Sequence, residues 1–172
     1  EQFAEARKYC GVGSTRYPRD YRFVESQLWL QLIPNAKQDI PEAWRLVFRV
    51  DSVTPPASRA YQSAFARLIV GGIIGKSARP AGGGPAQGPL ADSARRVIER
   101  ARVGVDVDPT QELLGYEAVM WTQMGSYDEA ISILKRYMPL NPDHSFQVGG
   151  NVHWWWRVLM DKPEFKALTT QR

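Results

Sequence analysis

A four-residue signature recurs along the chain at a spacing that suits helices. Each copy has Ala, an apolar or Cys residue four positions later, a small or apolar residue three positions beyond that, and Pro five positions further on. The three complete copies are Ala6, Cys10, Gly13 and Pro18; Ala43, Val47, Val50 and Pro55; and Ala130, Leu134, Tyr137 and Pro142. A fourth copy, Ala94, Ile98 and Ala101, has Asp106 in place of Pro. Repetition with a period of roughly 20 to 50 residues is typical of stacked units rather than of one compact core.

The signature predicts where helices begin and end. Positions four and then three residues apart lie on one face of a helix, and a Pro soon afterwards ends it. We therefore expect helices over 3–14, 41–51, 91–103 and 127–138. Apolar faces between them predict partner helices over 21–33, 58–70 and 113–124. The expected fold is all-α, a single domain over 1–172 built from about three and a half helical hairpins.

Composition and charge limit the classes of protein to which this chain could belong. The 172 residues are 44% hydrophobic, enough for a sizeable core, and 22 Lys and Arg against 18 Asp and Glu give a net charge of +4. Basic residues are scattered apart from Arg95, Arg96, Arg100 and Arg102, so nucleic-acid binding is not indicated. The single Cys10 excludes an internal disulfide. The longest apolar stretch, 68–75, is shorter than the roughly 20 residues that cross a bilayer, so no transmembrane segment is expected.

One segment has low complexity. Residues 77–89 are mostly Gly, Pro, Ala and Ser, a composition that cannot hold a helix. We expect an insertion loop over 78–89 that connects two hairpins. It could be disordered alone and ordered against a partner.

The stretch 124–142 carries a family resemblance. It contains Gly125, Tyr127, Asp128, Glu129 and Ala130, and it closes on Asn-Pro. This pattern resembles the tetratricopeptide repeat (TPR) of bacterial proteins, although bulky Tyr137 stands where the family has a small residue. The resemblance implies a degenerate, TPR-like right-handed solenoid whose concave face is lined by the first helix of each hairpin.

A catalytic site is not expected. Residues 70–77 nearly match a phosphate-binding loop, but Val70 replaces the first Gly, and Pro80 follows where Lys76 and Ser77 should open a helix. A Gly-containing helix end is the better interpretation. His144 and His153 alone are too few for a metal site. We therefore expect a protein that is not an enzyme, with no cofactor and no metal.

The Trp triplet near the carboxyl end is unusual. If 152–160 is a helix, Trp154, Trp155 and Trp156 spread over roughly 200° of its surface and cannot all enter one groove. Two alternatives stay open: a Trp-rich capping helix within a terminal cap over 144–172, or a contact with a partner. In the cap, Phe165 and Leu168 would pack back onto the stack.

These expectations point to a protein-protein interaction module. The TPR resemblance implies that a partner would meet the concave face at Arg22, Glu25, Trp29, Glu112, Thr122 and Gln123. The triplet adds Trp154, Trp155 and Trp156 as candidate contacts. The apolar edge around Phe3, Ala6 and Cys10 should also need a cover.

The leading hypothesis for function is an accessory or scaffold subunit that docks onto a larger assembly, for example a membrane-extrinsic subunit of a bacterial photosynthetic or respiratory complex. The alternative is the carboxy-terminal docking or sensor domain of a bacterial regulatory protein or kinase, and a nucleotide-binding enzyme ranks below both. The compartment is left open, with the periplasm slightly favoured over the cytoplasm.

Overall fold

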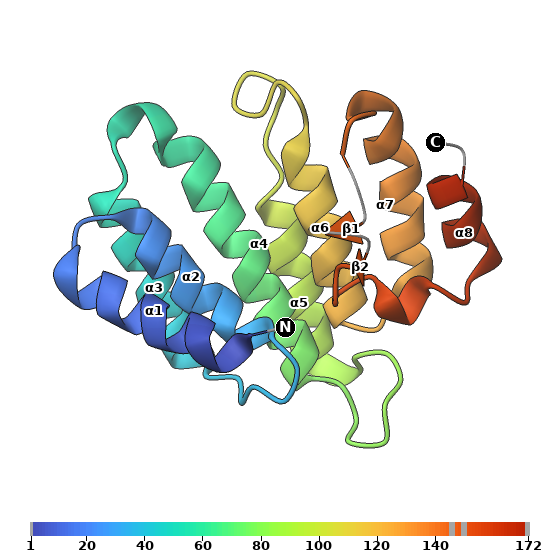
Figure 1. Ribbon diagram of the computed structural model, residues 1–172, viewed down its shortest axis with the longest axis horizontal. Helices are drawn as coiled ribbons and strands as arrows, with labels where there is room; N and C mark the ends of the chain where they lie inside the picture. The colour runs from blue at the N-terminus through green and yellow to red at the C-terminus, as the bar shows by residue number, and fades with distance from the viewer. Residues whose placement is uncertain (1, 145–146, 149–150, 171–172) are drawn as a thin grey trace.

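The computed structural model describes residues 2–144, 147–148 and 151–170. Apart from one very short β-hairpin it is all-helical, as expected (Figure 1). The elements are α1 (Phe3–Arg16), α2 (Tyr21–Leu32), α3 (Ile40–Val53), η1 (Pro56–Ser58), α4 (Arg59–Ser77), α5 (Gly88–Arg100), α6 (Glu112–Gln123), α7 (Tyr127–Leu140), β1 (Gln147–Val148), β2 (Asn151–Val152), η2 (Arg157–Leu159) and α8 (Pro163–Thr170). Strands β1 and β2 pair antiparallel. None of the helices in the described ranges is both long and apolar enough to span a membrane.

Each of the seven helices expected from the signature and its partner faces is present. The main difference in length is at α4, which continues past residue 70 to Ser77. At the start of α3, the Asp39 side chain accepts a hydrogen bond from Glu42 N, and Pro41 occupies the first turn. Asp108 has the same role for α6, because its carboxylate accepts hydrogen bonds from Glu112 N and Leu113 N.

Helices follow one another along the long axis, from α1 at one end to α8 at the other (Figure 1). Helix α2 packs on α1, α3 and α4; α4 also packs on α3, α5 and α6; α6 packs on α7, and α7 packs on α8. Buried apolar residues from α2 to α8 form one continuous core. Helix α1 contributes little to it, since Gly13 is its one buried residue.

Three glycines explain why α4 can pack so closely on α5 and α6. A Cβ atom at Gly71 would lie 2.5 Å from Ile98 Cγ1 of α5. The Cβ positions at Gly72 and Gly75 would lie 2.2 and 2.0 Å from side-chain atoms of Met120 and Met124, at α6. These distances are shorter than any van der Waals contact, so the backbone of α4 approaches its neighbours in a way that only Gly permits. The resemblance of 70–77 to a phosphate-binding loop thus arises from a helix-packing surface.

Lys76 caps the carboxyl end of another helix, α2. Its Nζ donates hydrogen bonds to Leu32 O and Ile33 O, at 2.7 Å each, where α2 ends. A cation suits the carboxyl end of a helix, whose last carbonyls lack partners. Burial lowers the pKa of Lys76 to about 8, with a smaller effect from the charge of Arg79, so the side chain is still mainly protonated at neutral pH.

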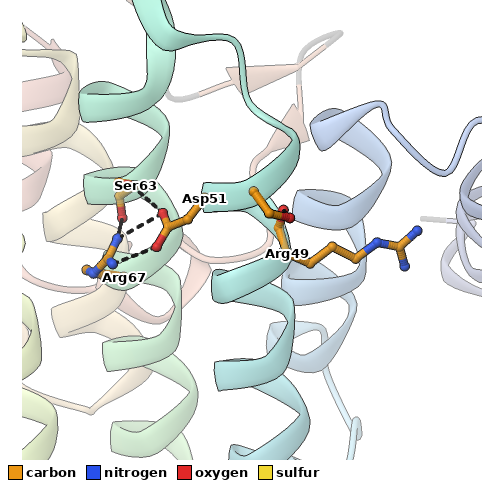
Figure 2. A network of polar contacts seen from close by, with 5 residues as sticks. Arg49, Asp51, Ser63 and Arg67 are labelled. Atoms are coloured by element: carbon orange, nitrogen blue, oxygen red, sulfur yellow. Dashed lines mark hydrogen bonds and ion pairs between the residues drawn. The ribbon is translucent and has the colours of Figure 1, made fainter.

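A polar network joins α3 to α4. Figure 2 shows the Asp51 carboxylate turned toward Ser63 and Arg67, whereas Arg49 extends from another side of α3. Arg67 Nη2 donates to Asp51 Oδ2 at 2.8 Å, and Ser63 Oγ donates to Asp51 Oδ1. Burial opposes ionisation of Asp51, but the hydrogen bonds from Arg67 and Ser63 outweigh it and hold the pKa of Asp51 below its usual value. Arg49 instead donates to Pro18 O at 3.0 Å and ties α3 to the α1–α2 connection.

The Gly- and Pro-rich connection folds against the turn between α6 and α7. It spans 78–87 rather than 78–89, because α5 already begins at Gly88. Ala86 N donates to Met124 O at 2.7 Å, and Ala86 itself is buried. Gly125, with φ +77°, leaves room for the loop, since a Cβ there would lie 2.8 Å from Gly84 O. The end of the loop near Ala86 is therefore packed against the protein's own surface, whereas residues 80–85 are exposed.

The expected helix over 152–160 is wrong. The described segment runs through β2, a turn, and the single 3₁₀ turn η2. Trp156 N donates to His153 O at 2.9 Å, and Leu159 N donates to Trp156 O at 2.9 Å, which are short-range turn bonds. On a regular helix three adjacent indoles would have left one ring in water, whereas the turn directs all three to apolar partners. Phe165 and Leu168 do pack onto the core, as expected.

We predict opposite effects of Gly→Ala substitutions in α4 and α1. Gly71→Ala should lower the free energy of unfolding by about 1–3 kcal/mol, because the new methyl group would collide with Ile98. Gly11→Ala is the matched control, since no atom lies within 4 Å of its Cβ position, and it should raise stability by about 0.5–1 kcal/mol. Urea denaturation of both variants measures this, and a stabilising Gly71→Ala would contradict the close approach of α4 and α5.

We also predict a structural cost for Lys76→Met. Removal of the two hydrogen bonds to the end of α2 should cost about 1–2 kcal/mol of unfolding free energy. Lys37→Met, on an exposed residue, should change it by less than about 0.5 kcal/mol. Thermal denaturation of the two variants gives the comparison; equal midpoints would show that Lys76 does not cap α2.

Candidate binding pocket between α6, α7 and the carboxy-terminal segment

Aromatic rings from four parts of the chain meet on one face of the helices. Trp29 of α2 lies 6.2 Å from Phe65 of α4 and 6.1 Å from Tyr116 of α6, measured between ring centroids. Phe65 and Tyr116 are 4.6 Å apart, edge to face. Trp155 of the carboxy-terminal segment joins them at 5.8 Å from Trp29. The segment after α7 therefore folds back over α2 and α6, as its position in front of α6 shows (Figure 1).

A cavity of about 360 Å³ lies beside this cluster. It is called the Tyr116 pocket below. Its lining residues come from α6, from α7 and from the segment that follows α7: Glu112, Gly115, Tyr116, Val119, Tyr137, Met138, Asp143, His144, His153, Trp155 and Trp156. This volume is in the range of sites for small molecules or single side chains.

Tyr137 and Gly115 shape the floor of the pocket. A Cβ at Gly115 would lie 2.9 Å from Tyr137 Cζ, so the ring of Tyr137 rests on the bare backbone of α6. The Tyr137 hydroxyl forms a hydrogen bond with His144 Nδ1, and this contact holds the chain just after α7. Asn141 Nδ2 donates to Thr110 O at 2.9 Å and fixes the same turn to the connection before α6. The bulky residue in the repeat signature is therefore compensated by a Gly on the facing helix.

The lining carries negative charge and aromatic surface. Glu112 and Asp143 supply two carboxylates, and no Lys or Arg is among the described lining residues. The Tyr61 hydroxyl lies 3.5 Å from Glu112 Oε2. Burial raises the pKa of Tyr116, and the charges of Glu112 and Glu25 raise it further. The ring at the centre of the site is thus in a negative electrostatic environment.

Two histidines line the same pocket in different ways. His153 stacks on Trp155, with 4.7 Å between ring centroids and 8° between ring planes, while His144 is held by Tyr137. Both were considered from the sequence as candidate metal ligands. In the described part of the chain, no group of three or more His, Cys, Asp and Glu side chains is placed to hold a metal ion.

Glu25, which the TPR resemblance assigned to a partner surface, is buried. Its side chain belongs to α2 and the residue is 8% exposed. Within the described residues, Glu25 Oε1 has no hydrogen-bond partner. Burial raises the pKa of Glu25 to about 7, with a smaller contribution from the negative charge of Asp20. A carboxylate here is costly, so the group favours its protonated form.

The remaining predicted residues divide between the pocket region and other places. Trp29 is half-buried in the aromatic cluster, and Glu112 lines the pocket. Arg22 is exposed and pairs with Asp20 at 2.6 Å. Thr122 and Gln123 are buried, and the Thr122 hydroxyl donates to Ala118 O, so neither faces an open surface.

The three tryptophans have separate partners. Trp154 meets Phe3 of α1 edge to face at 6.1 Å, so the ring covers part of the apolar edge expected to lie open. Trp155 joins Trp29 and the pocket. Trp156 is buried, lies 6.2 Å from Phe165 and also lines the pocket.

Sequence reasoning missed Tyr116, Tyr137 and Asp143 as site residues. Tyr116 could have been found, because it lies one helical turn after Glu112 on the same face of α6. No local signal in the sequence identifies Asp143, which reaches the site through the turn after α7.

The Arg cluster on α5 and just after it is partly used in ion pairs. Arg102 forms a bidentate pair with buried Glu117, and Arg95 pairs with Asp92.

Glu25→Gln should change how stability depends on pH. The pKa of Glu25 rises from its ordinary value of 4.5 to about 7 on folding, so the folded chain holds a proton that the unfolded chain releases in this window. Wild-type stability should therefore fall as pH rises from 4.5 to 7. At pH 8 Glu25→Gln should be the more stable protein, by on the order of 2 kcal/mol.

Denaturation of the wild type and Glu25→Gln at pH 5 and pH 8 tests this. The difference between the two proteins isolates Glu25 from other titrating groups. Glu42→Gln, at a partly exposed residue of α3 that pairs with Arg45, is the control. A Glu25→Gln curve parallel to that of the wild type would show that Glu25 is not desolvated.

No family model matches this chain, and neither a curated protein nor a solved structure does. The TPR resemblance of 124–142 therefore stays a prediction. The residues of the Tyr116 pocket and the rings beside it are the basis on which a function can be proposed.

Proposed function

We propose that the chain is a non-enzymatic interaction module that binds a polypeptide segment of a partner protein at the Tyr116 pocket and the neighbouring aromatic surface. The observation that carries the proposal is the convergence of Trp29, Phe65, Tyr116 and Trp155 beside a cavity of about 360 Å³. Tyr and Trp are enriched where a few residues supply most of the binding energy of an interface. Such rings offer a large contact area with little conformational entropy to lose.

The arrangement of helices supports a TPR-like stack as the framework. Pairs α2–α3, α4–α5 and α6–α7 are each in contact, and so are α2–α4 and α4–α6. A stack of hairpins in which the first helices form one layer has this set of contacts. In that stack, the aromatic surface lies on the layer of α2, α4 and α6, which is the concave side in repeat proteins of this kind.

We favour binding as the role of this pocket because of the side chains among its described lining residues. Four of them are Tyr or Trp, which suits recognition of a side chain. Docking onto a larger assembly, as an accessory or scaffold subunit, is the cellular role that we propose for such a module.

Selection from a displayed library of random peptides tests the proposal. Peptides enriched on the wild-type chain should bind Tyr116→Leu at least about tenfold more weakly, because the central ring of the site is lost. Phe48→Leu is the matched control, since Phe48 is an exposed aromatic residue of α3 outside the site. Circular dichroism confirms that each variant is folded.

The outcomes separate clearly. Peptides whose affinity falls with Tyr116→Leu and not with Phe48→Leu support the proposal. Peptides that bind both variants as well as the wild type place the interaction elsewhere. A library that yields no enriched peptide on the wild-type chain would also argue against peptide recognition.

A further inference from the structure

We propose that the Tyr116 pocket takes an organic cation, namely the Lys or Arg side chain of the bound segment. This inference rests on the proposed function for the source of the cation, and on the pocket alone for its chemistry. It goes beyond the proposed function because it names the group that the pocket recognises.

The charges of the lining residues are the first argument. Glu112 and Asp143 are acidic, and the described lining contains no Lys or Arg to neutralise them. Neither carboxylate has an ion-pair partner within the described residues. The chain as a whole has a net charge of +4, so this acidic pocket is a local exception that does not follow from composition.

Aromatic surface is the second argument. Tyr116 and Tyr137 come from α6 and α7, while Trp155 and Trp156 come from the segment that folds back over them. A ring has a negative face, so a cation that lies over the face of one of these rings is attracted by it, and the attraction grows when water is excluded. Rings together with carboxylates are therefore better suited to an alkylammonium or guanidinium group than to an anion or a neutral group.

The negative electrostatic potential at Tyr116 agrees with these two arguments. After burial, the charge of Glu112 is the next cause that raises the pKa of this phenol, with a smaller effect from Glu25 when its carboxyl group is ionised. The same charges that oppose a negative phenolate would favour a positive group beside the ring. Glu112 thus acts on the centre of the pocket and not merely on its edge.

Small cations test the chemistry without any peptide. Choline and Nα-acetyl-lysine amide should bind saturably, as followed by Trp fluorescence and by isothermal titration. The neutral choline isostere 3,3-dimethyl-1-butanol should bind at least about tenfold more weakly, because it has the same shape and no charge. Equal binding of choline and its isostere, or no saturable binding of either cation, would overturn the proposal.

Variants locate the binding. Glu112→Gln keeps the shape of the side chain and removes its charge, so it should weaken choline binding by roughly threefold to tenfold. Glu42→Gln is the matched control, because Glu42 is also in the first turn of its helix but lies on α3, paired with Arg45. Equal affinities of Glu112→Gln and wild type would overturn the assignment to this pocket.

The peptides from the library connect the cation to its source. Replacement of each Lys by norleucine, or of each Arg by citrulline, should reduce affinity at one position. The loss at that position should be smaller with Glu112→Gln than with the wild type, as expected for two groups that interact. If Tyr116-dependent peptides bind equally well without any cation, the cation proposal is wrong while the interaction module stands. If choline binds with the expected dependence on Glu112 and no peptide is ever enriched, the pocket chemistry is supported for a free small cation and the proposed function fails.

Discussion

The close approach of α4 to its neighbours is the constraint on which the remaining structure depends. Helix α4 packs on α2 and α3 on one side and on α5 and α6 on the other. Gly71, Gly72 and Gly75 allow the close approach to α5 and α6, because a Cβ atom at any of them would require Ile98, Met120 or Met124 to shift. The same approach sets Phe65 against Tyr116 and brings Tyr61 to Glu112, so the wall of the candidate pocket is positioned by backbone contacts that lie further along α4. Because protein interiors are close-packed, a shift of one helix is transmitted to the helices packed against it.

The pocket itself depends on a large residue of α7 that packs against a glycine of α6. Tyr137 occupies a position where the TPR pattern that 124–142 resembles has a small residue, and Gly115 on α6 makes room for its ring. The Tyr137 hydroxyl also forms a hydrogen bond with His144 Nδ1, just after α7. Trp155 and Trp156 line the same pocket from the carboxy-terminal segment. One large side chain in α7 therefore has two consequences, a floor for the cavity and an anchor for the chain where it leaves the helix.

Charge near the site is distributed in a way that costs stability. Glu25 is buried without a hydrogen bond to Oε1 from any described residue, and burial raises its pKa to about 7. Glu112 and Asp143 add two more acids nearby, although the protein carries net positive charge. Departures from the usual rules of burial and pairing are found at functional sites more often than elsewhere. Protonation of Glu25 removes one negative charge from this region, and a bound cation would balance the charges of Glu112 and Asp143.

The sequence by itself determined the helices, because their signals are local. The spacing of Ala43, Val47 and Val50, and the Pro that follows, define α3 from neighbouring residues alone, and the same holds for α7. The TPR resemblance, and not a local signal, selected Glu112, which lines the pocket, and Trp29, which lies in the aromatic cluster beside it. The expected helix over the Trp triplet failed, since three adjacent indoles are directed by partners as distant as Phe3, Trp29 and Phe165. Tertiary structure alone decided that Gly71–Gly75 is a packing surface, that Lys76 closes α2, and that Asp143 and His153 meet Tyr116 across a cavity. The physical reason is the same in each case: helix formation depends on residues three and four positions apart, whereas a pocket depends on which side chains of distant segments fill, or fail to fill, the space between packed helices.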